Sequence, residues 1–565
     1  MKSKWQLIAT FIILSSVVLA ACQPAATPAP TATEPPVPPT QVVAPTEIPF
    51  TPTMHEASSC DYGGIIKSIE AVDRLTVKFT MCVPDPAFPA KAAFSAFQIY
   101  PSEYLEATGG GGDLIEAPIG TGPYVLEAWN RGDNVTLRRF DDYWGEKAKS
   151  ATVVIRWSQE GPQKLIDLQA GTVDGIDNVA PDDIARVQAD PKLQLTPRDP
   201  FNIFYVGFNN TYPPFDNEKV RQAIAMSIDR KRIVDTFYPP GSSVANQFLP
   251  EGLLARPDSK WYDFDPVAGK ALLAEAGFPH GFKTTLSYRD VFRGYLPEPP
   301  VVAQDIAAQL KANLNITLKL DQMESGAYLD ASDAGEIKGL HLLGWTGDYP
   351  DPTNFYDYHF GAGASKQFGT KWDDITSRLS QAGQLGDEEA RRAIYTEVND
   401  LLKQHVVMIP VAYGASAAAY KATVVGAHAS PLGNESMEVM YIPGQDTFVW
   451  MQNAEPIGLY CADESDGESL RVCEQINESL LAYEVGGAKV IPSLATGYTA
   501  NEDATEWTFT LHDGVKFHDG SLLDANDVVL SWVVQWDAAD PLHVGRVGDF
   551  SYFSGLFGGF LNAPK

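Results

Sequence analysis

Catalytic and cofactor-binding motifs are absent from this sequence of 565 residues. It contains no G-x-S-x-G, no P-loop, no dinucleotide fingerprint and no H-E-x-x-H. Its nine histidines are scattered. His512 and His518 share strand parity, but each precedes Asp-Gly, so we interpret them as flanking a hairpin rather than forming a metal site. The sequence therefore predicts no enzyme, no cofactor and no metal centre.

Basic residues and long apolar runs are also scarce. Lysine and arginine number 42 against 72 acidic residues, a net charge of −30, which argues against a nucleic-acid partner. The run from 7 to 19 is short for a membrane span, follows Lys2 and Lys4, and ends in a lipobox-like Leu-Ala-Ala-Cys. We predict a lipoprotein signal peptide over 1–22, lipidated at Cys22; the alternative is an ordinary signal peptide. Residues 23–53, rich in Pro and Thr, predict an extended linker.

Cysteine is rare, with five in the chain. Apart from Cys22, four remain: Cys60, Cys82, Cys461 and Cys473. An even number in an exported protein favours disulfides, of which three pairings are possible. The local pairs Cys60–Cys82 and Cys461–Cys473 are favoured because each would staple one short unit. Zinc is the weaker alternative, because no CxxC spacing accompanies these cysteines.

Several motifs that are present occur together in one known family. Gly120-Thr121-Gly122-Pro123-Tyr124 opens a strand pattern, and a strand over 204–209 leads through Pro-Pro-Phe to a helix over 220–229. A Tyr-Trp turn at 143–144 and an Ala-Gly-x-x-Asp helix end at 170–174 complete the set. From about 65 to 549 the chain resembles the family 5 bacterial extracellular solute-binding proteins, receptors of peptide and nickel importers driven by ATP-binding-cassette transporters.

The resemblance implies a two-lobed α/β fold of the periplasmic-binding-protein type (type II, cluster C) with an extra small domain. We expect the small domain to combine 54–118 with 489–565, lobe I to combine 119–245 with 426–488, and lobe II to span 246–425. It also implies a monomeric receptor, exported and lipid-anchored outside the cell membrane or in the periplasm, that passes peptides to a permease and its ATPase. Nickel chelates or oligosaccharides are alternative ligands, and a lipid-anchored hydrolase or a sensor is an alternative role.

The order of the segments differs from that family. A strand over 507–511, its hairpin and a helix over 523–532 lie early in the mature proteins of the family, but here they come last. The order resembles a circular permutation, with new ends around Cys60 and Asn562 and a joining linker over 427–447, rich in Gly, Ser and Pro. The alternative is an artefact of the gene, such as neighbouring copies misjoined.

The candidate binding site is the loop over 343–352, Leu-Gly-Trp-Thr-Gly-Asp-Tyr-Pro-Asp-Pro. A carboxylate beside aromatic rings can hold an ammonium group. The loop resembles the binding loop of dipeptide receptors, which implies that Asp348 anchors the peptide amine. The loop's other predicted binding residues are Gly344, Trp345, Thr346 and Tyr349, the first three through their backbone. Alternatively, its aromatic residues only pack, or Asp348 caps the following helix. Three residues are candidates for holding the ligand carboxylate: Arg289, Arg293 and Lys338.

Overall fold

A computed structural model describes residues 50–564 with the exception of residue 254. The predicted signal peptide, Cys22 and the linker up to residue 49 lie outside the described residues. From Phe50 onward the chain forms one compact unit. Within the described part, no helix is long and apolar enough to cross a membrane.

The first lobe is built on a seven-stranded mixed sheet of order β4-β5-β6-β16-β7-β15-β8. Its strands are β4 (Tyr124–Asn130), β5 (Asn134–Arg139), β6 (Thr152–Trp157), β7 (Gly175–Ile176), β8 (Leu193–Arg198), β15 (Ser416–Lys421) and β16 (Thr447–Gln452). Its helices are α4 (Gly161–Ala170), α5 (Ile184–Ala189) and α14 (Gly467–Ile476). Strand β16 lies between β6 and β7 and runs parallel to both. A strand from the C-terminal part of the chain therefore completes the middle of a sheet whose first strands come from the N-terminal part.

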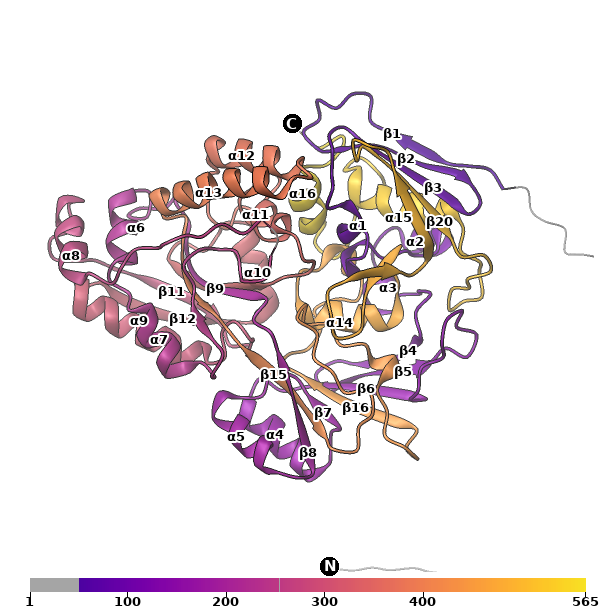
Figure 1. The fold of residues 1–565 in the computed structure, drawn as a ribbon, viewed down its shortest axis with the longest axis horizontal. Coiled ribbons are helices and arrows are strands. Elements are labelled where there is room, and N and C mark those ends of the chain that lie inside the picture. Colours follow the sequence, from indigo (N-terminus) through magenta and orange to yellow (C-terminus); the bar gives the residue numbers. More distant parts are fainter. Residues whose placement is uncertain (1–49, 254, 565) are drawn as a thin grey trace, which may run out of the picture. The chain divides into compact units, whose positions relative to one another are not determined.

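The second lobe is built on a six-stranded sheet of order β10-β14-β9-β13-β11-β12 (Figure 1). Its strands are β9 (Asn202–Phe208), β10 (Ser243–Val244), β11 (Lys283–Arg289), β12 (Thr317–Met323), β13 (Leu340–Thr346) and β14 (Met408–Tyr413). Its helices are α6 (Glu218–Ala225), α7 (Arg230–Phe237), α8 (Pro266–Glu275), α9 (Pro299–Leu314), α10 (Ser325–Asp333), α11 (Pro352–Phe360), α12 (Asp373–Gly383) and α13 (Glu388–His405). All seven residues of the inner strand β9 are buried, which explains its almost continuous apolar run.

Sheet membership differs from the expected lobe boundaries at 245/246 and 425/426. Strands β9 and β10 belong to the second lobe, and β15 belongs to the first. The chain therefore crosses between the lobes at 199–201 and 414–415. The two crossings are tied together, because the Asn202 amide donates to the Gly414 carbonyl (2.8 Å) and accepts from its N–H (2.9 Å). Sequence periodicity missed this because a buried strand has the same apolar pattern in either sheet.

The small domain joins segments from both ends of the described chain. Its five-stranded sheet has the order β1-β2-β3-β20-β19. The strands are β1 (Met54–Glu56), β2 (Ile66–Asp73), β3 (Thr76–Met81), β19 (Ala495–Ala500) and β20 (Glu506–Leu511), with a hairpin of β17 (Leu481–Tyr483) and β18 (Val490–Pro492) beside it. Its helices are α1 (Phe88–Lys91), α2 (Ser102–Thr108), α3 (Asp113–Glu116), α15 (Ala525–Trp536) and α16 (Ser551–Phe557). In Figure 1 the indigo strand β3 lies beside the yellow strand β20, with which it pairs.

Two disulfides lie in the described part, and they are the two local pairs. Cys60 and Cys82 are joined with their Cα atoms 5.6 Å apart, and Cys461 and Cys473 with theirs 6.3 Å apart. The second disulfide ties a short 3-10 turn (Cys461–Asp463) to helix α14. His518 lies against the Gly122 carbonyl (2.9 Å), so it contacts the backbone of the glycine motif that opens β4.

Candidate ligand-binding site

A cavity with about 990 Å³ of space free of protein atoms, partly open to solvent, is lined by both lobes and the small domain. The second lobe contributes the end of β13 and the loop after it, and the first lobe contributes the start of α14. The small domain contributes Tyr552 of α16. The convergence of elements from several domains on one cavity is typical of a site for a small ligand.

Two glycines shape the end of β13 and the loop that follows it. A Cβ atom on Gly344 would lie 2.3 Å from the Tyr295 ring, and one on Gly347 would lie 2.1 Å from the Phe201 ring. Glycine is therefore required for the close packing at both positions. Asp351 then begins α11, since its carboxylate accepts from the Thr353 N–H (2.9 Å). The helix cap is Asp351, and Asp348 is left for another role.

Four of the five predicted binding residues of the loop line the cavity: Gly344, Trp345, Thr346 and Asp348. Tyr349 does not line it. The Tyr349 side chain is fully buried, and its hydroxyl lies 3.1 Å from the Thr353 hydroxyl. The structure thus gives Tyr349 a packing position behind the loop.

Asn354, on the first turns of α11, organises the loop. Its carbonyl oxygen accepts from the Trp345 indole (3.0 Å) and from the Asp348 N–H (2.9 Å). Its amide donates to the Asp348 carboxylate (2.8 Å). Trp345 also stacks on Tyr358, with ring centroids 4.2 Å apart. One fully buried amide therefore fixes both the aromatic ring and the carboxylate relative to the helix.

The Asp348 carboxyl group is 7% exposed and has no basic partner in the described chain. Its second oxygen accepts from the Tyr552 hydroxyl (3.2 Å). Burial raises the pKa of Asp348 to about 7, although the bonds from Asn354 and Tyr552 oppose the rise. A positively charged group beside the Asp348 carboxyl group would favour the ionised form of this carboxyl group.

Strand β13 also has an incomplete edge at the cavity. It pairs with β9 along its whole length, but with β11 only at Leu340 and His341. The edge of residues 343–346 on the side of β11 is therefore unpaired. An extended ligand backbone can pair with an edge of this kind as an added strand.

The structure separates the three candidates for binding a carboxylate. Arg289 and Arg293 line the cavity, whereas Lys338 does not and lies over the Tyr212 ring. Arg293 pairs with Asp466 (3.1 Å) and with Glu468. Arg289 donates to the Ser325 hydroxyl (2.9 Å), and its distance to the Asp466 carboxylate is 4.0 Å. Arg289 therefore has more donor capacity left for a ligand than Arg293.

The wall formed by the first lobe is a buried ionic network. Arg198 and Arg471 each donate to Asp177 at 2.9 Å, and Arg471 also donates to Glu435 at 2.9 Å. Against the effect of burial, the two arginines lower the pKa of Asp177. The network holds its charges in fixed positions and leaves the wall nearly neutral.

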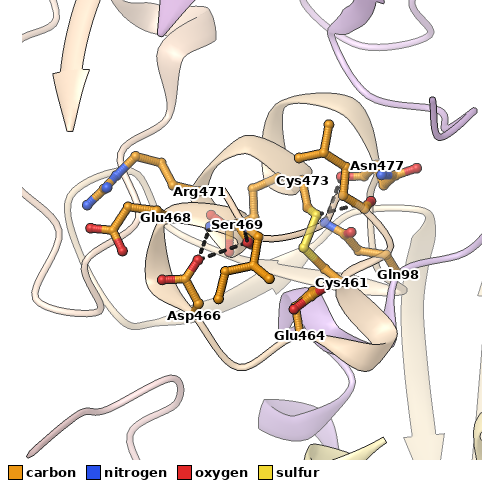
Figure 2. Close-up of a disulfide and its surroundings, with 12 residues drawn as sticks. Gln98, Cys461, Glu464, Asp466, Glu468, Ser469, Arg471, Cys473 and Asn477 are labelled. Carbon is orange, nitrogen blue, oxygen red and sulfur yellow. Dashed lines mark hydrogen bonds between the residues drawn. A yellow bond between two sulfur atoms is a disulfide. The ribbon is translucent and has the colours of Figure 1, made fainter. Parts of the chain in front are cut away.

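Glu468, on the same helix as Arg471, differs from the other acids of this wall (Figure 2). Its side chain is 1% exposed, lines the cavity, and has one oxygen without a hydrogen-bond partner in the described chain. Burial raises the pKa of Glu468, and Arg293 opposes the rise. A ligand N–H or O–H could satisfy this oxygen. Sequence reasoning missed Glu468 and Tyr552, because nothing in their local sequence marks them.

Comparison with known proteins identifies relatives along most of the chain. The family model of the bacterial extracellular solute-binding proteins, family 5 (middle part), matches residues 40–367 and 489–545. Heme-binding protein A of Haemophilus influenzae is 30% identical over 67% of this chain and 71% of its own. Di/tripeptide-binding protein 1 of Pseudomonas aeruginosa is 29% identical over 69% of this chain and 73% of its own.

Among solved structures, the periplasmic binding protein DppA of Helicobacter pylori, in complex with the peptide STSA, matches with a TM-score of 0.62. It is 26% identical and covers 67% of this chain and 74% of its own. The dipeptide-binding protein of a Pseudoalteromonas species, at 24% identity, matches with a TM-score of 0.64 over 67% of this chain and 76% of its own. The expected two-lobed α/β fold is confirmed.

Proposed function

The chain belongs to family 5 of the bacterial extracellular solute-binding proteins, and from this membership we propose that it binds short peptides and delivers them to the permease of an ATP-binding-cassette importer. Its relatives include the di/tripeptide-binding protein of Pseudomonas aeruginosa and the dipeptide-binding protein of Escherichia coli. These are named as binding proteins, and the proposed role requires no covalent chemistry.

The observation that carries the proposal is the position of Asp348 in the cavity, where its carboxyl group forms no ion pair with a described residue. Asp333 also lines the cavity without an ion pair, but it lies on α10, outside the predicted binding loop. Asp177, Asp466 and Glu468 line or border the same cavity, and each has an arginine partner. Asp348 has only neutral donors, from Asn354 and Tyr552. The ammonium group of a peptide would supply the missing charge through a charge-assisted hydrogen bond, with Trp345 beside it.

The rest of a peptide fits the remaining features of the cavity. Its backbone would pair with the free edge of β13 at Gly344, Trp345 and Thr346, and its carboxylate would pair with Arg289. Asp348, the edge of β13 and Arg289 all belong to the second lobe, whereas the cavity wall formed by the start of α14 belongs to the first lobe. A ligand held by these groups therefore contacts both lobes only when the lobes are closed. Binding then shifts the population toward the closed form, with bending at the two crossings near Asn202 and Gly414.

The test is a binding measurement with matched ligands. We expect isothermal titration calorimetry to detect a dipeptide with a free amino terminus and to detect its N-acetylated form weakly or not at all. Small-angle scattering should show compaction with the first ligand only. Binding of a nickel–histidine chelate or an oligosaccharide, without binding of any peptide, would retain the receptor role and contradict the peptide assignment.

The proposal includes export and anchoring by acyl chains at Cys22, which lies outside the described residues. A Cys22→Ser variant should leave the membrane fraction and appear in the soluble extracytoplasmic fraction. Retention of that variant in the membrane fraction would contradict lipid anchoring at this residue.

We also propose that the segment order is a genuine circular permutation. Support comes from the pairing of β3 with β20 and from the hydrogen bond between the Ile65 N–H and the Phe557 carbonyl (2.9 Å), which brings the two ends of the described fold together. A reordered gene that joins residue 562 to residue 60 and opens the chain at the exposed residues 443–447 should give a cooperatively folding protein with the same ligand affinity. Failure of the reordered chain to fold, while the native order folds, would contradict the proposal.

A further inference from the structure

A second cavity lies next to the first, and Leu432 and Asn434 line both. It contains about 1010 Å³ of space free of protein atoms, partly open to solvent. The C-terminal half of α14 and the β17–β18 hairpin line this cavity, together with the turn at Tyr143 and Trp144. The proposed peptide-binding residues of β13 and its loop do not line it.

The charge of this second cavity is of one sign. Glu438, Glu474, Glu478 and Glu484 line it, and its lining contains no lysine and no arginine. Within the described chain none of these four glutamates forms an ion pair. The first cavity, by contrast, has four arginines in its lining. Unpaired carboxylates gathered in a partly buried space repel one another and lose hydration, and a cation would remove both costs.

The glutamates of the second cavity differ in the number of hydrogen bonds that their carboxylates already accept. Glu478 accepts from the Tyr143 hydroxyl (2.7 Å) and from the Trp144 indole (2.8 Å), so it holds these aromatic side chains in place. Glu474 accepts from the Asn434 amide through one oxygen. The Glu438 carboxylate makes no hydrogen bond to another described side chain. Glu484 is exposed, so Glu438 and Glu474 are the half-buried carboxylates with acceptor capacity left for a ligand.

An independent observation points to a missing hydrogen-bond donor. Gln98 is 1% exposed and lines the second cavity, and its carbonyl oxygen has no partner among the described residues. Its amide nitrogen is engaged, since it donates to the Asn477 carbonyl (3.2 Å). Figure 2 shows Gln98 and Asn477 close to the disulfide, on the side away from Glu468 and Arg471. A buried amide oxygen normally accepts a hydrogen bond, and a ligand N–H group could donate one to Gln98.

The helix end adds to the negative potential. Glu474 lies in the last turn of α14, where the helix carries partial negative charge and acidic residues are unfavourable. The pKa of Glu474 is raised to about 8, mainly by burial, with Glu435 and Glu438 adding to the rise and Arg471 opposing it. Burial likewise raises the pKa of Glu438 to about 7. The arrangement is poor for the stability of the empty protein and favourable for binding a cation.

We propose that the second cavity is a binding site for an organic cation, an alkylammonium or guanidinium group held by Glu438, Glu474 and Gln98 against the aromatic side chains of Tyr143 and Trp144. Carboxylates combined with aromatic faces suit such cations. Among the described residues no three acidic, histidine or cysteine side chains are grouped to hold a metal ion, which favours an organic cation. The cation is either a free amine or the basic side chain of a ligand that occupies the first cavity and reaches past Leu432 and Asn434.

The first test compares 1,5-diaminopentane with 1,5-pentanediol by calorimetry on the whole exported protein. If the cation is a free amine, the diamine binds saturably and the diol does not. Glu474→Gln and Glu438→Gln each weaken the diamine at least tenfold. Glu502→Gln, a change at an exposed residue without a hydrogen bond in the described chain, leaves it unaltered. The weakening by Glu474→Gln and Glu438→Gln should also appear in the Asp348→Asn background, which distinguishes diamine binding in the second cavity from binding at Asp348. Failure of the peptide assignment is thereby distinguishable from failure of this site.

A second test addresses the other source of the cation. If the cavity takes a ligand side chain, a lysine-containing peptide binds at least tenfold more tightly than its norleucine counterpart, and Glu474→Gln abolishes that preference. Thermal unfolding verifies that each variant folds. If the glutamate variants do not fold, Ser493→Lys, which adds an ammonium group to the lining, should weaken the diamine or the lysine preference. The proposal is overturned if neither the diamine nor the lysine side chain depends on these changes.

Discussion

Replacing Asp348 with asparagine should weaken the binding of a free-amine dipeptide while leaving the unliganded protein at least as stable. The substitution keeps the shape of the side chain, and its amide oxygen can still accept from Asn354. It removes the negative charge that we assign to the peptide ammonium group. Charge-assisted hydrogen bonds contribute about 1.5–3 kcal/mol, so we expect the dissociation constant to rise by about 10- to 150-fold.

The role that we assign to Asp348 also predicts how the affinity for a free-amine dipeptide depends on pH. Because the pKa of Asp348 is raised to about 7 by burial, the group is mostly ionised at pH 7.5 and mostly protonated at pH 5.5. If only the ionised form binds the ammonium group, the affinity should fall by about 20-fold between these two pH values. In the Asp348→Asn variant this dependence should disappear.

The stability of the unliganded Asp348→Asn variant shows whether the substitution acts on ligand binding or on folding. A carboxyl group whose pKa is raised in the folded state stabilises the protein fully below its unfolded value, and this contribution is lost as the pH rises through about 7. The rise from 3.8 corresponds to an upper limit of about 4 kcal/mol. At pH 7.5 the free energy of unfolding of unliganded Asp348→Asn should therefore be unchanged or higher, as measured by denaturant titration.

Calorimetric titrations of a dipeptide and its N-acetylated form into the wild type, Asp348→Asn and Glu502→Gln test this reasoning. Glu502→Gln should match the wild type in every respect. The reasoning is refuted if the asparagine variant binds the free-amine peptide as tightly as the wild type does. It is also refuted if the affinity of the wild type does not change between pH 7.5 and 5.5.

Three further predictions concern the frame of the site. Arg293→Met leaves Glu468 buried without a partner in the second lobe and Asp466 with only Arg289, at 4.0 Å. Breaking a buried ion pair costs about 3–5 kcal/mol, so we expect a less stable closed form, seen as a larger radius of gyration in scattering and a weaker ligand affinity. Gly344→Ala brings a Cβ to 2.3 Å from Tyr295 and should lower the free energy of unfolding by about 1–3 kcal/mol in denaturant titration. Removal of the Cys461–Cys473 disulfide, which joins residues 12 apart, should cost about 2–4 kcal/mol in the same assay.

Each of these changes has a matched control or a contradicting result. Arg392→Met removes a half-buried arginine whose acidic partners, Glu388 and Glu389, lie on the same helix and outside the cavity, so it should alter neither the radius nor the affinity. Gly386→Ala adds a Cβ that meets nothing within 4 Å, and its unfolding should match the wild type. Equal stability of Gly344→Ala and Gly386→Ala would contradict the packing argument. Full stability after loss of the disulfide would contradict the contribution that we assign to it.

The sequence by itself predicted the candidate binding loop and its irregular backbone. The Asp351-Pro352 pair begins α11 through a contact with Thr353, and such a short-range signal can be read from one chain. Gly344 and Gly347 are visible in the sequence, but the rings that require them, Tyr295 and Phe201, are distant in sequence.

The helix expected over 220–229 spans Glu218–Ala225 and has the predicted cap at Asn217, whose side chain accepts from the Lys219 N–H (3.0 Å). Its predicted end was wrong, because Asp229 caps the next helix, α7. Caps and periodicity are local, so sequence reasoning captured the existence and the start of this helix.

Tertiary structure alone decided which distant groups complete the site. Tyr552 meets Asp348 across 204 residues of sequence, and Arg293 meets Glu468 across 175. The choice between Arg289, Arg293 and Lys338 likewise depended on which side chains face the cavity. The sheet membership of β9, β10 and β15 differs from the predicted lobe boundaries, because a buried strand has the same apolar pattern in either sheet. Such features arise from long-range packing, whose energy is shared among many residues and leaves no mark on the local sequence.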